Sequence, residues 1–140
     1  MRKILLGSHG KMASGLENTL RLFVGNDYPV TSISAYLDSE DGYLDEIDQF
    51  IEGIEDGDEA VIFTDILGGS VNQQVIAKVF ASEKKIFVIS NMNLPVVISI
   101  LLHFEPLSDE VILTLIDECK IQLMNYEKTH ANETEDDFFG

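Results

Sequence analysis

The segment KILLGSHG, residues 3–10, decides how the rest of the sequence is interpreted. It begins with an apolar run, residues 4–6, and a glycine, a serine and a histidine follow at once. Short runs that are apolar at every position are typical of strands buried on both faces of a parallel sheet. The sequence therefore predicts a buried first strand, with His9 in the loop at its carboxyl end.

Strand and helix patterns alternate from this segment to residue 119. Periodicity and β-branched runs predict strands over 30–37, 60–63 and 86–89, and helices over 11–24, over 44–54, from 70, from 95 and from 108. Ser70 is interpreted as a helix cap and Pro95 as a first-turn residue. Four βα units in series predict a doubly wound, mainly parallel α/β sheet of the flavodoxin-like kind, with the order 2-1-3-4 and helices on both faces.

The composition limits the possible classes of protein. The chain has 140 residues, 45% hydrophobic and 24% charged, as expected for one globular domain. Its 25 acidic and 9 basic residues give a net charge of −16, which argues against nucleic acid and anionic lipid as direct partners. No stretch has the roughly 20 apolar residues of a membrane span, and the first residues do not match a signal peptide. The lone Cys119, interpreted as a small core residue, fits a reducing cytosol, so the expected location is cytoplasmic.

The end of the chain is less regular than the rest. Residues 121 and 123 are apolar and alternate with polar neighbours, so both a helix and a last strand stay open there. Residues 129–140, THANETEDDFFG, are polar and acidic, a composition typical of mobile tails. The prediction is one domain over residues 1–128 and an acidic, mobile tail over residues 129–140.

Two loops of the predicted sheet carry residues able to perform chemistry. In open α/β sheets the functional site lies beyond the carboxyl ends of the strands. His9 follows the first strand and Asp65 the third, so if these strands are neighbours both side chains enter one crevice. A carboxylate that accepts the proton of one ring nitrogen makes the other a better nucleophile toward phosphorus. The pair predicts phosphoryl transfer; the alternative is that His9 is an ordinary polar loop residue and that Asp65 only caps a turn.

The loop after the third strand has the composition of a phosphate-binding loop. Gly68, Gly69 and Ser70 precede a predicted helix, whose N-terminal N–H groups and dipole favour anions. The Ser70 hydroxyl is a further candidate donor, and the glycines let the backbone approach a ligand closely. The same three residues also fit a tight turn with a helix cap and no ligand.

The sequence does not indicate a metal or cofactor site. The three histidines are scattered and Cys119 has no second cysteine at ligand spacing, so no metal site is predicted. The GxxxxGKS motif of nucleotide-binding loops is absent, and no cofactor is predicted. Asn91 and Asn93, after the fourth strand, are interpreted as turn formers and not as ligands.

Three segments carry recognisable motifs: KILLGSHGKMASGLENTLRLFVG (3–25), VIFTDILGGSVNQQV (61–75) and KKIFVISNMNLPVVISIL (84–101). Together they resemble the enzyme IIA family of mannose-type sugar phosphotransferase systems. The second segment is similar to the family pattern D-x-x-G-G-[ST]-P-x-N, with Val71 in place of the proline. The resemblance covers roughly residues 1–104, with the segments in the family's order and spacing.

The resemblance implies a phosphohistidine relay. Members of this family accept a phosphoryl group from the carrier HPr and pass it to enzyme IIB, which phosphorylates sugar entering through the membrane subunits IIC and IID. In this sequence His9 matches the phosphoryl acceptor, Asp65 the supporting carboxylate, and Gly68, Gly69 and Ser70 the phosphate-binding loop. The resemblance also implies a homodimer. It leaves open which sugar is transported and which ring nitrogen of His9 is phosphorylated.

Three alternative functions are compatible with parts of the pattern. A related domain serves as the phosphoryl donor of dihydroxyacetone kinase systems, although the GGS loop is closer to the mannose type. A non-catalytic flavodoxin-like module that binds an anion or regulates a partner would need no transfer to His9. A histidine phosphatase fits poorly, because the only arginines, Arg2 and Arg21, lie outside the histidine loop.

Overall fold

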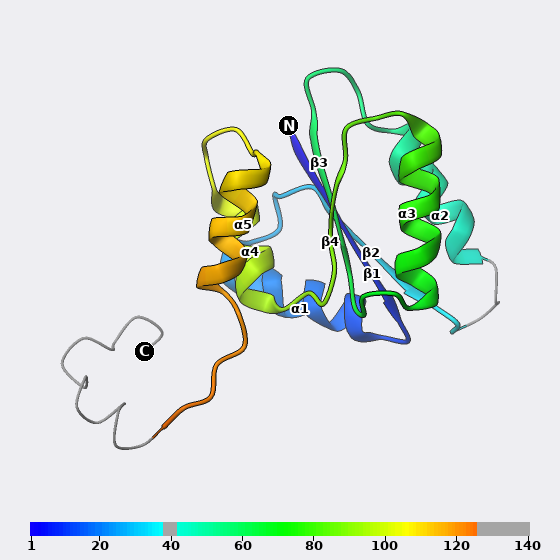
Figure 1. Cartoon of the computed structure of the whole chain (residues 1–140). Coiled ribbons are helices and arrows are strands. Elements are labelled where there is room, and N and C mark those ends of the chain that lie inside the picture. Colours follow the sequence, from blue (N-terminus) through cyan, green and yellow to red (C-terminus); the bar gives the residue numbers. More distant parts are fainter. Residues whose placement is uncertain (38–41, 126–140) are drawn as a thin grey trace.

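The computed structural model describes residues 1–37 and 42–125, and Figure 1 shows their arrangement. The strands are β1 (Arg2–His9), β2 (Val30–Ala35), β3 (Glu59–Thr64) and β4 (Phe87–Ile89). The helices are α1 (Met12–Val24), α2 (Gly42–Glu52), α3 (Ser70–Ser82), α4 (Leu94–Leu102) and α5 (Asp109–Glu118). The strands pair in parallel in the order β2-β1-β3-β4, which confirms the predicted doubly wound α/β fold and its strand order.

Different helices cover the two faces of the sheet. Figure 1 shows α1, α4 and α5 on one face and α2 and α3 on the other. Successive side chains of a strand point to opposite faces, so each buried strand contributes to both layers. Ile4 and Leu6 of β1 pack in the first layer and Leu5 in the second, all without exposed surface. The apolar run that opens the sequence is therefore buried on both faces, as predicted.

The predicted cap of α3 is wrong, and the predicted start of α4 is confirmed. Ser70 does not cap α3: the cap position is Gly69, and Ser70 is the first helical residue. Its side chain contacts the candidate site instead. Pro95 lies in the first turn of α4, as predicted, and Asn93 caps that helix by accepting a hydrogen bond from the Val96 N–H at 2.9 Å.

The end of β2 and the segment after α5 differ from what the sequence predicts. β2 ends at Ala35, two residues before the predicted end, because Tyr36 has a φ of +66°, a left-handed conformation that a strand cannot continue through. Residues 121–125 form neither helix nor strand. The predicted tail, residues 129–140, lies outside the described residues.

Three further features are the position of Cys119, the length of the helices and the grouping of metal-binding residue types. Cys119, at the C-terminal cap of α5, is half-buried and packs against the core. Over residues 1–37 and 42–125, no helix is both long and apolar enough to cross a membrane. The same residues contain no group of three or more His, Cys, Asp or Glu side chains arranged to hold a metal ion.

Candidate active site

The carboxyl ends of β1 and β3 meet at one edge of the sheet, the lower edge in Figure 1. His9 is the last residue of β1 and Asp65 directly follows β3, and the two strands pair in register up to Gly7 and Thr64. The His9 Nδ1 lies 2.8 Å from the Asp65 Oδ2. The structure thus places the two predicted reactive side chains in direct contact.

Three hydrogen bonds hold the Asp65 carboxylate. Its Oδ2 accepts the His9 backbone N–H at 2.9 Å as well as the ring, and its Oδ1 accepts the Ile66 N–H at 3.0 Å. Burial of this carboxyl would by itself raise its pKa, since the side chain is only 6% exposed. The hydrogen bonds and the charge of His9 outweigh burial, so the pKa of Asp65 lies below its usual value. Asp65 is therefore ionised at neutral pH.

These contacts define the state of the imidazole ring of His9. Because an ionised carboxylate has no hydrogen to donate, the single ring hydrogen of a neutral His9 lies on Nδ1 and points to Asp65. Nε2 then carries a lone pair, and it lies 3.0 Å from the Ser70 Oγ. Both ring nitrogens therefore have a partner. The ring is still reachable from solvent, because the His9 side chain is 40% exposed. This geometry favours nucleophilic attack by Nε2.

Gly68 and Gly69 contribute to the site through their shape. Gly68 has a φ of +79°, which favours glycine, and a Cβ on Gly69 would lie 3.4 Å from the His9 Cε1. Their N–H groups, the predicted phosphate donors, already have acceptors in the loop. Gly68 donates to the Asn72 Oδ1 at 3.0 Å, and Gly69 to the Ile66 carbonyl oxygen at 3.1 Å. A Cβ at position 69 would lie nearest to the Ile66 carbonyl oxygen, at 3.3 Å, and would also touch the His9 ring.

Donors for an anion are present at the start of α3. Ser70 and Val71 are the first two residues of this helix, and the first amides of a helix have no intrahelical carbonyl to bond. The positive end of the helix dipole lies at the same place. The Ser70 hydroxyl, 3.0 Å from the His9 Nε2, therefore lies at a helix start of the kind that favours anions.

Two asparagines that the sequence patterns do not assign to the site support its loops. Asn72 is 1% exposed, and its amide donates to the Thr64 Oγ1 at 2.8 Å and to the Ser90 Oγ at 2.6 Å. Asn91 has the left-handed φ of a turn residue, +55°, and its Oδ1 also accepts the Leu67 N–H at 2.9 Å. A polar residue in a helix carries no sequence signal of burial, which explains why this buried supporting role of Asn72 is not predicted.

The Asn72→Ala variant is expected to be less stable than the native chain. The substitution leaves the Gly68 N–H and the Thr64 and Ser90 hydroxyls without this partner. Buried polar groups left unsatisfied predict a loss of about 2–3 kcal/mol in the free energy of unfolding, measured by urea denaturation. Gln74→Ala, at an exposed position of the same helix, is the control and should change stability by less than about 0.5 kcal/mol. Equal stability of the two variants would contradict this role of Asn72.

Tyr36 also contacts the site, although its pattern in the sequence is that of an ordinary strand residue. Its ring stacks on the His9 ring, with centroids 5.5 Å apart and planes at 19°. Its hydroxyl donates to the Ser70 Oγ at 2.9 Å. Because Tyr36 follows β2, which pairs with β1, a third strand end contributes to the site.

The fold and these contacts define the class of protein: a flavodoxin-like α/β domain whose first strand ends in a carboxylate-paired histidine, next to a helix N-terminus. The family described as the PTS system fructose IIA component, where PTS is the phosphotransferase system, matches residues 3–115. The chain belongs to this family of mannose-type enzyme IIA components. It is therefore a phosphoryl carrier of a sugar phosphotransferase system, as the sequence motifs predict.

Solved structures share the fold. The chain is similar to phosphotransferase system component EIIA from Streptococcus agalactiae, with 25% identity and a TM-score of 0.73 over 91% of this chain and 99% of that one. The PTS IIA protein associated with the fucose utilization operon from Streptococcus pneumoniae has 22% identity and a TM-score of 0.74, over 92% and 96% of the chains. The mannose/sorbose-specific IIA subunit from Enterococcus faecalis has 19% identity and a TM-score of 0.68, over 89% of this chain and 95% of that one. No curated protein sequence is significantly similar to the chain.

Proposed function

We propose that His9 carries the phosphoryl group, which it accepts from HPr and passes to enzyme IIB. One observation carries the proposal: the His9 Nδ1 is bound by an ionised Asp65, while Nε2 faces the Ser70 hydroxyl and the ring is 40% exposed. A residue that exchanges a group with two other proteins must be reachable from solvent and must have one nucleophilic atom that carries no hydrogen of its own. The relay implies a cytoplasmic location and an indirect link to the membrane subunits IIC and IID.

The transfer is an exchange between two imidazole rings. The lone pair of the His9 Nε2 attacks the phosphorus, and the phosphorus–nitrogen bond of phosphorylated HPr breaks. The electron pair of that bond returns to the HPr ring, so no proton is gained or lost overall. The Nδ1–H of His9 stays hydrogen bonded to Asp65, whose charge supports the positive ring formed during attack. Transfer to enzyme IIB repeats the exchange with His9 as the donor.

The start of α3 supports the phosphoryl group once it is bound. The Ser70 hydroxyl lies 3.0 Å from Nε2 and turns its hydrogen from the nitrogen to a phosphoryl oxygen. The first amides of α3 add further donors. Since in-line transfer needs mainly positioning and charge stabilisation, these groups meet its requirements.

Intact-mass spectrometry of the native chain with phosphoenolpyruvate, enzyme I and HPr tests the proposal. The expected result is a gain of one acid-labile phosphate, which disappears when HPr is omitted and is lost again on addition of enzyme IIB. Active donors that leave the mass unchanged would contradict the proposal. That result would favour the non-catalytic, anion-binding module.

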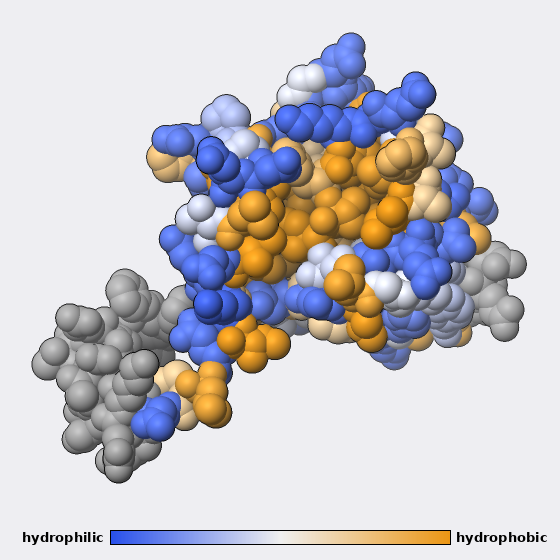
Figure 2. Space-filling model, in the orientation of Figure 1, coloured by the Kyte–Doolittle hydropathy of each residue, from blue (hydrophilic) through white to orange (hydrophobic). Residues whose placement is uncertain are grey.

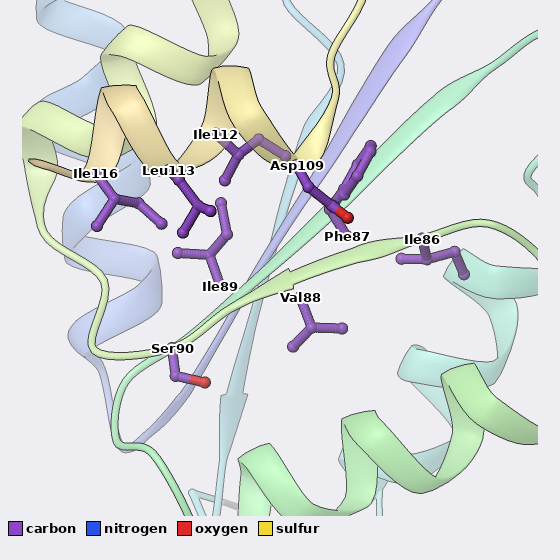
Figure 3. A pocket seen from close by; sticks show the side chains of 9 residues that line it. All are labelled: Ile86, Phe87, Val88, Ile89, Ser90, Asp109, Ile112, Leu113 and Ile116. Carbon is purple, nitrogen blue, oxygen red and sulfur yellow. The ribbon is translucent and has the colours of Figure 1, made fainter.

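We further infer that the chain is a homodimer, as the family resemblance implies, and that a second copy covers the free edge of β4. β4 is the last strand of the sheet in the described residues, and edge strands favour pairing with another chain. An apolar cavity of about 490 Å³ lies between β4 and α5, lined by side chains such as Phe87, Ile112 and Leu113 (Figure 3). Figure 2 shows continuous apolar surface on this side of the molecule, and exposed patches of this kind mark interaction surfaces.

Sedimentation equilibrium tests the dimer. The native chain is expected at twice the mass of one chain, and Leu113→Asp is expected to shift it toward the monomer, because Leu113 lines the cavity and is 66% exposed. Leu22→Asp makes the same change at an 83% exposed position on α1 and should leave the dimer intact. A monomeric native chain, or equal effects of the two variants, would contradict the assignment.

A further inference from the structure

Tyr36 covers one face of the reactive imidazole and also binds the serine beside it. Its ring lies 5.5 Å from the His9 ring at an angle of 19°, and its hydroxyl donates to the Ser70 Oγ at 2.9 Å. The hydroxyl of buried Tyr43 lies 3.4 Å from that of Tyr36. One side chain therefore contacts both the ring that reacts and the hydroxyl that faces its Nε2.

The backbone of Tyr36 has an uncommon conformation, which indicates that the surrounding structure holds this residue in place. Its φ of +66° is in the left-handed region, where residues other than glycine, asparagine and aspartate are uncommon. Such residues persist where the surrounding structure holds them, and they cluster at functional sites. Here the Gly10 N–H donates to the Ala35 carbonyl oxygen at 2.9 Å, which fixes the chain just before Tyr36 against the histidine loop.

The hydrogen bonds of the site have one consistent direction. In the neutral imidazole that attacks, ionised Asp65 takes the hydrogen on Nδ1, so the His9 Nε2 is able only to accept. Ser70 has a single hydroxyl hydrogen, and Tyr36 donates to its oxygen. The Ser70 hydrogen is therefore directed at Nε2, 3.0 Å away. Without the Tyr36 hydroxyl, the direction of that hydrogen is no longer fixed.

We propose that Tyr36 is a positioning residue for phosphoryl transfer, acting through Ser70 and through the face of the His9 ring. This inference rests on the proposed function of His9. The Tyr36 hydroxyl keeps the Ser70 hydrogen toward Nε2 before transfer and toward the phosphoryl oxygens afterwards. The stacked ring limits rotation of the imidazole, and its face attracts the positive charge that the imidazole acquires during attack.

A double-mutant cycle tests the role of the hydroxyl. The rate of phosphoryl transfer from phosphorylated HPr is measured for the native chain, Tyr36→Phe, Ser70→Ala and the double variant. Loss of one directed hydrogen bond predicts transfer about fivefold slower for Tyr36→Phe and no further loss in the Ser70→Ala background. Tyr28→Phe, a partly exposed tyrosine just before β2, is the matched control and should retain the native rate. A native rate for Tyr36→Phe, or a fivefold loss that persists beside Ser70→Ala, overturns the proposal.

A second readout does not depend on any phosphoryl donor. In ¹⁵N NMR spectra of the unphosphorylated chain, Tyr36→Phe is expected to shift the His9 Nε2 resonance, because the hydrogen bond from Ser70 is no longer directed. The Nδ1 resonance, governed by Asp65, should stay in place, whereas general unfolding would move both. An unchanged Nε2 resonance overturns this inference. Failure of the native chain to accept phosphate overturns instead the proposed function of His9.

Discussion

The His9→Ala variant is expected to gain no phosphate under conditions in which the native chain is fully phosphorylated. The substitution removes the only ring that combines a carboxylate-bound Nδ1 with a reachable Nε2 among the described residues. His103 offers no substitute, because its Nε2 is buried and without a hydrogen-bond partner, in the connection after α4. Intact-mass spectrometry after incubation with phosphoenolpyruvate, enzyme I and HPr measures the difference.

Two controls separate this loss of chemistry from a loss of structure. His9 is 40% exposed at the end of β1, so His9→Ala should leave the urea midpoint of unfolding close to that of the native chain. His103→Gln removes another imidazole away from the site and should retain full phosphorylation. Acid-labile phosphate on a folded His9→Ala chain would show that another residue is the carrier.

The contact between His9 and Asp65 follows from the sequence through the topology of the sheet. Fully apolar runs of residues predict buried parallel strands, and the carboxyl ends of parallel strands lie at the same edge. Once β1 and β3 are neighbours, a histidine that ends one and an aspartate that follows the other are brought together. This part of the site needs no knowledge of loop conformation, and for that reason the sequence suffices.

The roles of the residues in the loop after β3 depend on backbone conformation, which the sequence does not specify. Ser70 has the residue type of a helix cap, yet Gly69 takes the cap position and leaves the Ser70 hydroxyl for His9. The N–H groups of Gly68 and Gly69 are expected donors, yet they bond within the loop. One register step at a helix start thus changes which atoms face the reactive ring.

Tyr36 shows a different limit of sequence reasoning. Tyrosine favours strands, so the β-branched run before it predicts a strand that continues to residue 37. The left-handed φ of +66° contradicts this local preference, and the contacts with His9 and Ser70 occur together with it. Conflicts between local preference and tertiary structure are expected at functional sites.

Asp65→Asn is expected to slow phosphoryl transfer to His9 by about a hundredfold or more. The Asp65 Oδ2 accepts both the backbone N–H and the ring Nδ1–H of His9, and Oδ1 accepts the Ile66 N–H. The NH₂ group of an asparagine must face either His9 or Ile66. In either orientation it meets an N–H group that donates to the carboxylate in the native chain, so two donors face each other. If the NH₂ faces Nδ1, the ring hydrogen moves to Nε2 and the nucleophilic lone pair is lost. If it faces Ile66, the tautomer survives but the charge that supports the positive ring is absent.

Single-turnover transfer from phosphorylated HPr measures this rate, and Asp117→Asn is the matched control. Asp117 is 76% exposed on α5, so the same loss of a carboxylate there should leave the rate unchanged. ¹⁵N NMR of the His9 ring distinguishes the two orientations, because only one of them moves the hydrogen to Nε2. Transfer at the native rate in Asp65→Asn would mean that Ser70 and the amides of α3 suffice for catalysis. Asp65 would then serve to hold the loop after β3 through Ile66, and not to activate the histidine.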